Sequence, residues 1–273
     1  MIKNRKIGFI GAGFMAQAMI SGLLSSKTLK GENVYITNKS NIDKLKEIKD
    51  LWNVNTTTDK SFLVKETDII VLAVRPGDVK EVLEEIKDFV SDSHLIITLA
   101  AGISISYIKN ILGNNISLIR AMPNTSCVVK ESATALVVDK KVDSKYKDMA
   151  DEIFSSIGKV VYVEEDELDA ISGFSGSGPA YVYYMIEALE EAGTKIGLKK
   201  EMVRLLAGQT VLGAAKTFIE TAEDPDKLRE KVTTPGGITF EGISVLQERG
   251  FKEILVEAII KAVERSKDLG EGI

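Results

Sequence analysis

Short apolar runs alternate with amphipathic stretches from the beginning of the chain. Residues 7–10 (IGFI) form an apolar run, a glycine-rich turn follows, and residues 14–25 have the apolar spacing of a helix. A second apolar run, VYIT, occupies residues 34–37. This order predicts strand, glycine turn, helix and strand, which is a βαβ unit of about 30 residues.

The alternation continues through the first half of the chain. The run DIIVLA at residues 68–73 is almost continuously apolar, as expected of a strand that is covered on both faces. Further strands are predicted at residues 95–100, 117–121, 134–138 and 160–163, and helices at residues 78–90, from the cap Ser104 to Gly113, and at 144–158. We therefore predict an α/β fold with a doubly wound parallel sheet.

The glycine turn GAGFMA at residues 11–16 is typical of a dinucleotide-binding site. Gly11 would make the tight turn, Gly13 would let the backbone approach a pyrophosphate, and Ala16 is small enough for the helix to pack on the strand. The anion would lie at the helix N-terminus. Similar turns also serve plain α/β packing, so the motif alone leaves both interpretations open.

The second strand ends in Asn38, Lys39 and Ser40. A site that prefers NAD has Asp or Glu near this point to bind the ribose 2′-hydroxyl, and a carboxylate there would repel a 2′-phosphate. Asn, Lys and Ser would bind the phosphate, so we predict NADPH as cofactor, with NADH weaker. The alternative is that these are ordinary turn residues.

Three later strands are also followed by turns of small or polar residues, at 74–77, 101–102 and 122–125. In an open α/β sheet, ligands bind at the carboxyl ends of the strands. These turns are therefore expected on the same edge as the glycine turn.

From about residue 168 the strand pattern disappears and helical periodicity takes over. We place a domain boundary after Val163, which gives domains 1–163 and 164–273. The acidic run at 164–167 is interpreted as a solvated linker or a helix start. Residues 175–179 (SGSGP) are interpreted as a flexible turn. Helices are predicted at residues 179–196, 200–220 and 251–269, and a further helix follows the loop at 231–242 and ends at residue 248.

The helix at 200–220 is apolar or small on almost every side between residues 202 and 219. Such a helix must be buried around most of its circumference, and a helical domain of this size has few neighbours to bury it. We therefore expect a homodimer in which a second subunit covers this helix.

The segment KVTTPGGITFEG at residues 231–242 resembles a glycine-containing loop that opens a helix. Consecutive amides at such a helix start form a site for an anion such as a carboxylate, and Thr239 would add a hydroxyl. A capped turn between helices is the alternative.

Composition excludes several functions. The net charge is −5 and the basic residues are scattered, which argues against nucleic-acid binding. No apolar stretch is long enough to span a membrane, and no metal site is predicted. The lone Cys127 suits a reducing compartment, so a cytoplasmic protein is expected. The lone His94 is interpreted as an ordinary surface or edge residue.

Seven segments together resemble the pyrroline-5-carboxylate reductase family over nearly the whole chain. They are IGFIGAGFMAQAM (7–19), LAVRP (72–76), LAAGIS (99–104), RAMPNT (120–125), SGSGPAY (175–181), QTVLGAAK (209–216) and VTTPGGITFEGISVLQE (232–248). The resemblance implies reduction of L-1-pyrroline-5-carboxylate to L-proline, the last step of proline biosynthesis, with NAD(P)H. It also implies a Rossmann-like N-terminal domain and a helical dimerisation domain, with dimers often assembled into decamers.

The resemblance also implies roles for individual residues. The catalytic residue would be Thr239, whose hydroxyl would approach the ring nitrogen. The substrate carboxylate would bind at Thr234, Gly236, Gly237, Ile238 and Thr239. The cofactor would contact Ile10, Gly11, Ala12, Gly13, Phe14, Met15, Asn38, Lys39, Ser40, Ala73, Val74, Arg75, Pro76, Ala100, Ala101 and Gly102.

The chain departs from the family at Phe14, Arg75 and Lys231, and Asp59 is nearest to the position of the Asn on the family's adenine side. Lys231 could reach the cofactor or face solvent.

Two other functions remain as alternatives. A β-hydroxyacid dehydrogenase would need a catalytic Lys where this chain has Val182. A non-catalytic NADPH-binding regulator would not need the substrate loop.

Overall fold

The computed structural model describes residues 2–271, which divide into two compact units. The first unit contains the residues up to Ser177 together with the end of the chain from Lys261, and the second is Gly178–Ile260. Residues 164–177 therefore belong to the first unit by their backbone contacts. The domain boundary after Val163 stays a prediction.

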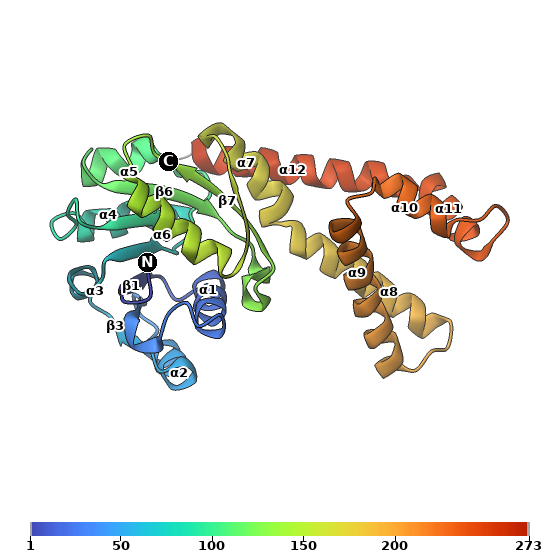
Figure 1. Ribbon diagram of the computed structural model, residues 1–273, viewed down its shortest axis with the longest axis horizontal. Coiled ribbons are helices and arrows are strands. Elements are labelled where there is room, and N and C mark those ends of the chain that lie inside the picture. Colours follow the sequence, from blue (N-terminus) through green and yellow to red (C-terminus); the bar gives the residue numbers. More distant parts are fainter. Residues whose placement is uncertain (1, 272–273) are drawn as a thin grey trace. The chain divides into compact units, whose positions relative to one another are not determined.

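An eight-stranded sheet forms the centre of the first unit (Figure 1). Its strands are β1 (Ile7–Ile10), β2 (Val34–Thr37), β3 (Asn55–Thr57), β4 (Ile69–Leu72), β5 (Leu95–Thr98), β6 (Ser117–Met122), β7 (Ser132–Val138) and β8 (Gly158–Tyr162). The strand order is β3-β2-β1-β4-β5-β6-β7-β8. Neighbouring strands are parallel, as predicted, except that β6 and β7 pair antiparallel. The connection at residues 123–131 is too short for the crossover that a parallel pair requires.

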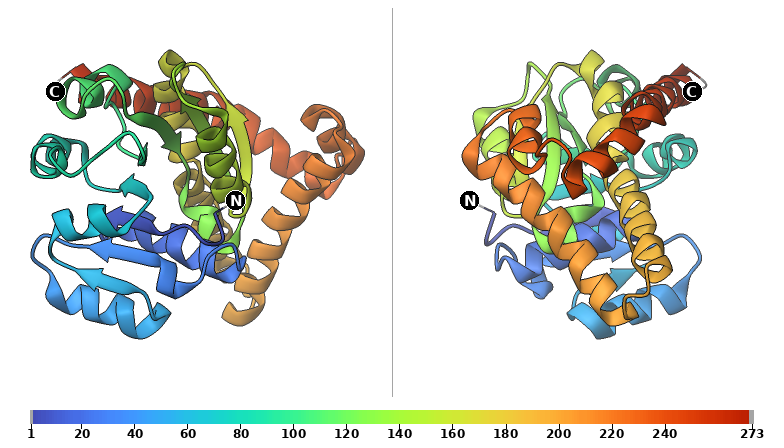
Figure 2. Two further views of the ribbon diagram at one scale, coloured as in Figure 1. Left: turned by 60° about the vertical axis from the view of Figure 1, so that its left-hand side comes forward. Right: turned by 90° about the vertical axis from the view of Figure 1, so that its right-hand side faces the viewer.

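Helices cover both faces of this sheet (Figures 1 and 2). One face packs against α1 (Phe14–Ser25), α2 (Ile42–Trp52) and α6 (Ser144–Ser155), and the other against α3 (Lys60–Glu66), α4 (Val79–Ile86) and α5 (Ile105–Leu112). The apolar residues of β4 alternate between these two cores, with Ile69 and Val71 in one and Ile70 and Leu72 in the other. The predicted doubly wound fold is thereby confirmed.

Several elements differ from their predicted form. Helix α4 is shorter than residues 78–90 and follows a 3₁₀ turn, η2 (Pro76–Asp78). The segment predicted as a flexible turn is helical instead. A π-helical turn, η5 (Ser172–Gly176), precedes α8, and the Ser177 amide donates to the Ser172 carbonyl at 2.9 Å.

The acidic run does begin a helical segment, η4 (Glu165–Glu167) followed by α7 (Leu168–Ile171). Glu165, however, is not simply solvated. One of its carboxylate oxygens accepts hydrogen bonds from the Arg120 guanidinium and from the Ile105 amide, both at 2.7 Å. This carboxylate therefore fixes the start of the segment to β6 and α5.

The second unit is helical, as predicted. It contains α8 (Gly178–Lys195), α9 (Lys200–Thr221), α10 (Pro225–Val232), α11 (Ile238–Glu248) and the first part of α12 (Phe251–Glu271). Helices α8 and α9 approach closely at Gly193, where a Cβ atom would lie 2.7 Å from the Val203 side chain. No helix within residues 2–271 is long and apolar enough to cross a membrane.

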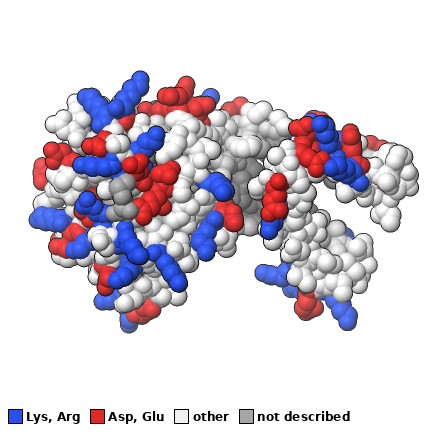
Figure 3. Space-filling view, viewed as in Figure 1, with Lys and Arg blue, Asp and Glu red and all other residues white. Residues whose placement is uncertain are grey.

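Much of α9 is not covered within the chain. Its buried residues are Val203 and Ala207, whereas Leu205 and Ile219 are 69% and 71% exposed. Figure 3 shows charges of both signs mixed over the first unit and broader uncharged areas over the helices of the second. An apolar helix in this state needs a further surface to pack against.

Candidate functional site

A groove lies at the carboxyl ends of β1, β2 and β4, where the strand order reverses between β1 and β4. Such a reversal is where ligands bind in open α/β sheets. The cavity measures about 490 Å³. It is lined by Ile10, Gly11, Gly13, Thr37, Asn38, Lys39, Ser40, Lys60, Ala73, Val74, Arg75, Asp78, Glu81 and Val82.

The glycine turn lines this groove with backbone atoms, because a side chain at Gly11 would clash with the neighbouring strand. Gly11 has a φ of 111°, and a Cβ atom on it would lie 2.4 Å from the Ala73 carbonyl oxygen. The Gly11 amide donates to the Thr37 carbonyl at 3.1 Å, and the Ala73 amide donates to Ile10 at 2.9 Å. These contacts join the ends of β1, β2 and β4.

Gly13 and Ala16 have the surroundings that the motif predicts. Gly13 is the N-cap of α1, and within the described residues no side chain caps the helix there and no atom lies within 4 Å of an added Cβ. Ala16 is fully buried against the sheet. The start of α1 is therefore open to an anion.

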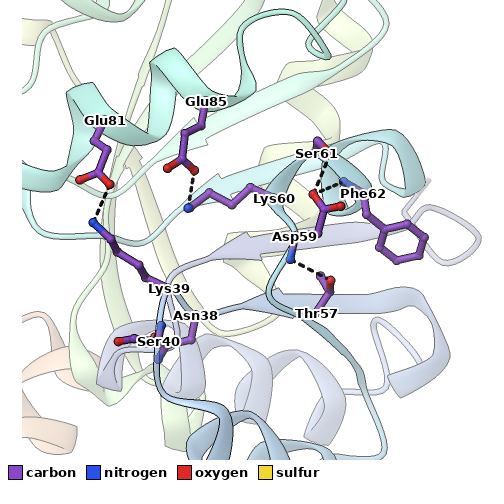
Figure 4. Close-up of polar contacts among 10 residues, drawn as sticks. All are labelled: Asn38, Lys39, Ser40, Thr57, Asp59, Lys60, Ser61, Phe62, Glu81 and Glu85. Carbon is purple, nitrogen blue, oxygen red and sulfur yellow. Dashed lines mark hydrogen bonds and ion pairs between the residues drawn. The ribbon is translucent and has the colours of Figure 1, made fainter.

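Three cations line the groove, and each pairs with an acidic residue that belongs to α4 or directly precedes it. The Lys39 ammonium lies 2.5 Å from Glu81, Lys60 pairs with Glu85, and the Arg75 Nε lies 3.3 Å from Asp78 (Figure 4 shows both lysine pairs). The hydrogen bond to Glu81 raises the pKa of Lys39 above its ordinary value.

The structure brings most of the predicted cofactor residues to the groove. Those that line it are Ile10, Gly11, Gly13, Asn38, Lys39, Ser40, Ala73, Val74 and Arg75. The buried Ala12, the exposed Phe14 and the half-buried Met15 and Pro76 lie in the same turns without lining the groove, and Ala100, Ala101 and Gly102 lie in the separate turn after β5. Binding by each of these residues stays a prediction.

The turn after β5 has a packing role of its own. Ala100 is buried, and a Cβ atom on Gly102 would lie 2.6 Å from the Gly270 amide nitrogen, near the end of α12. Gly102 also has a φ of 72°. Gly102 thus packs closely against the backbone near the end of α12, and contact of residues 100–102 with a cofactor stays a prediction.

Lys60 lines the groove although the sequence pattern did not single it out. It is the first residue of α3, three positions after the end of β3, which is a polar strand of three residues with little apolar signal. The preceding Asp59 is the N-cap of α3 and accepts hydrogen bonds from the Ser61 hydroxyl at 2.7 Å and the Phe62 amide at 3.1 Å. The signal for Lys60 was therefore only its position next to Asp59.

The loop predicted to bind the substrate lies in the second unit. Gly236 has a φ of 70°, and the Gly237 amide donates to the Thr234 carbonyl at 2.9 Å. A Cβ atom on Gly237 would lie 2.5 Å from the Thr234 hydroxyl. Gly237 is the N-cap of α11 without a side-chain cap among the described residues, so the amides of the first turn lack helical acceptors.

Thr239 belongs to this first turn, and Ile238 beside it is 96% exposed. Lys231, at the end of α10, pairs with Glu223 and has an exposed side chain. The loop therefore offers backbone amides and threonine hydroxyls, among them that of Thr239, which is a donor set suited to a small carboxylate.

His94 takes no part in either site. It precedes β5 and so lies at the opposite edge of the sheet from the groove. Its Nδ1 accepts from the Ser91 amide at 2.9 Å, and Nε2 faces the Val64 carbonyl at 3.2 Å. Within residues 2–271, no group of three or more His, Cys, Asp or Glu residues is arranged to hold a metal ion.

Two family models match the chain. The model described as "Pyrroline-5-carboxylate reductase dimerisation" matches residues 165–269, and "NADP oxidoreductase coenzyme F420-dependent" matches residues 6–102. The chain is 40% identical to pyrroline-5-carboxylate reductase 2 of Bacillus subtilis, over 98% of this chain and 96% of that protein.

Solved structures agree with these matches. Pyrroline carboxylate reductase of Plasmodium falciparum, solved with NADP bound, has a TM-score of 0.90 and 32% identity, over 98% of this chain and 99% of that one. The enzyme of Coxiella burnetii has a TM-score of 0.85 and 39% identity, with the same coverage. The chain therefore belongs to the pyrroline-5-carboxylate reductase family.

Proposed function

We propose that this protein reduces L-1-pyrroline-5-carboxylate to L-proline with NADPH, the last step of proline biosynthesis. The observation that carries the proposal is the open backbone cradle at the start of α1, where no described atom lies within 4 Å of a Cβ added to Gly13, in a chain 40% identical to a pyrroline-5-carboxylate reductase over nearly its full length. A backbone cradle of this kind fits a dinucleotide pyrophosphate.

The residues of the groove suit NADPH. The turn from Ile10 to Met15 would hold the pyrophosphate, and Asn38, Lys39 and Ser40, which directly follow β2, would offer donors to the 2′-phosphate. Residues 73–76 and 100–102 would border the nicotinamide. When bound, NADPH supplies the hydride that reduces the imine.

The protein's own part in the reaction is to bind and orient the substrate. The free amides at the start of α11 would bind the substrate carboxylate, and the Thr239 hydroxyl would hold the ring nitrogen. An imine near neutral pH can already carry the proton that the nitrogen needs, so no strong general acid is obligatory. Positioning then supplies most of the rate enhancement.

Residues 165–269 match a dimerisation domain, and the exposed apolar side chains of α9 would pack against a second subunit. A homodimer is therefore the basic unit of the proposed enzyme, and assembly of dimers into a decamer is proposed from the family alone. A cytoplasmic location is proposed because one cysteine suits a reducing compartment.

A direct assay tests the proposed reaction. The protein is mixed with NADPH and pyrroline-5-carboxylate at neutral pH, cofactor absorbance is followed, and the product is separated by chromatography. Loss of absorbance with formation of proline is expected. Tight NADPH binding without turnover would contradict the proposal and favour a regulator, and turnover of β-hydroxyacids instead would favour a dehydrogenase.

A further inference from the structure

Two lysines approach the β2 side of the groove from different elements. Lys39 follows β2 and Lys60 begins α3, and both line the cavity together with Ser40. Their exposure differs, because the Lys39 side chain is 69% exposed and the Lys60 side chain 13%. Figure 4 shows both ammonium groups directed toward α4.

Two glutamates of α4 hold these ammonium groups. Glu81 and Glu85 are four residues apart, so they lie on the same face of the helix, and they pair with Lys39 and Lys60 respectively. Each lysine is thus balanced by one carboxylate. A bound phosphate dianion would offer the same kind of acceptor oxygens to the same two ammonium groups.

We propose that Lys39 and Lys60 together bind the 2′-phosphate of the cofactor, and that Glu81 and Glu85 compete with this phosphate for the two lysines. The inference rests on the proposed use of NADPH and adds Lys60 and the two glutamates as residues that determine cofactor specificity. Without the 2′-phosphate the lysines stay paired with α4, so an NADH-like ligand gains nothing from them.

The competition follows from electrostatics. A carboxylate next to the phosphate repels it, while an ammonium group attracts it, and both effects are larger for the shielded Lys60 pair than for the exposed Lys39 pair. Removal of the charge of Glu85 should therefore strengthen phosphate binding, whereas removal of the charge of Lys60 should weaken it.

Calorimetric titration of the full chain with two probes tests this inference. Adenosine 2′,5′-bisphosphate carries the 2′-phosphate, and AMP does not. Lys60→Met should raise the Kd for the bisphosphate about tenfold, as expected for one charge-assisted hydrogen bond, and leave the Kd for AMP unchanged. Glu85→Gln, which keeps an acceptor but loses the charge, should lower the Kd for the bisphosphate severalfold.

Lys65→Met is the matched control, because Lys65 lies on the same helix and lines a different cavity, on the side of Arg5 and His94. It should leave both Kd values at the wild-type level. Circular dichroism checks that each variant is folded, and Lys39→Met provides a second, more exposed test of the same site.

Three results would overturn the inference: an unchanged bisphosphate Kd in Lys60→Met, an equal loss of both probes, or weaker bisphosphate binding in Glu85→Gln. Proline formation is measured separately. An active wild-type enzyme whose lysine variants bind the bisphosphate normally would refute the inference and leave the proposed reaction intact. A wild-type protein that does not distinguish the bisphosphate from AMP would refute both the inference and the NADPH assignment.

Discussion

A Cβ atom on Gly11 would lie 2.4 Å from the carbonyl oxygen of Ala73, closer than any side chain can pack. Gly11→Ala should therefore push the ends of β1 and β4 apart, in addition to the strain of a φ of 111°. We expect a loss of about 1 to 3 kcal/mol in unfolding free energy and weaker NADPH binding. Urea unfolding and calorimetric titration measure these two quantities.

Gly113→Ala is the control for this substitution. Gly113 has a φ of 97°, but in the described structure no atom lies within 4 Å of an added Cβ. It should show the backbone strain without the loss of cofactor affinity. If both variants bind NADPH equally well, the close approach of Gly11 to Ala73 has no part in shaping the groove.

Thr239→Val removes the hydroxyl from the first turn of α11 while keeping the shape of the side chain. If this hydroxyl orients the substrate nitrogen, kcat/KM for pyrroline-5-carboxylate should fall about tenfold or more, which corresponds to one hydrogen bond. Thr239→Ser should recover much of the loss. Light scattering should show unchanged assembly. Wild-type kcat/KM in the valine variant would remove Thr239 from the mechanism.

The Arg120 guanidinium is 5% exposed and pairs with Glu165 at 2.7 Å. Glu165→Ala would leave a buried charge and the Ile105 amide without this acceptor. We expect a loss of about 2 to 3 kcal/mol in unfolding free energy, measured by urea denaturation. Asp166→Ala, at an exposed neighbouring position, should be nearly neutral. Equal effects of the two substitutions would show that the Arg120 pair contributes nothing specific.

Burial raises the pKa of the Cys127 thiol to about 11. Because the thiolate is the reactive form, dithionitrobenzoate at pH 8 should not label the native protein and should label it in guanidinium. The same shift favours the folded state below pH 9, and this contribution is lost as the pH rises through 9 to 11. Rapid labelling of the native protein would contradict the burial of this thiol.

Much of the sheet could be predicted from the sequence because its central strands are buried on both faces. The strands β1, β4 and β5 are apolar apart from Thr98 at the end of β5, as expected when both faces of a strand are buried. The edge strand β3 is polar and three residues long, so it has no such pattern. The antiparallel pairing of β7 depends on the length of a connection, and the π-helical turn at Ser172–Gly176 has no simple sequence signal.

Some residues of the groove could likewise be predicted from the sequence, and others could not. Gly11, Asn38 and Ala73 could be placed in it because each follows a strand with a clear apolar pattern. Lys60 could not, since its place beside β2 depends on the pairing of β3 with β2. Its partner Glu85 looks like any exposed charge on an amphipathic helix. Residues that are brought together only by the tertiary structure can be identified only from the structure.

The most direct test of the proposed reaction is an isotope measurement. Pyrroline-5-carboxylate is reduced with NADPH that carries deuterium at both C4 positions, and the product is analysed by mass spectrometry and NMR. The account predicts proline with one deuterium, located at C5. Proline without deuterium at C5, or oxidation of NADPH without formation of proline, would contradict it.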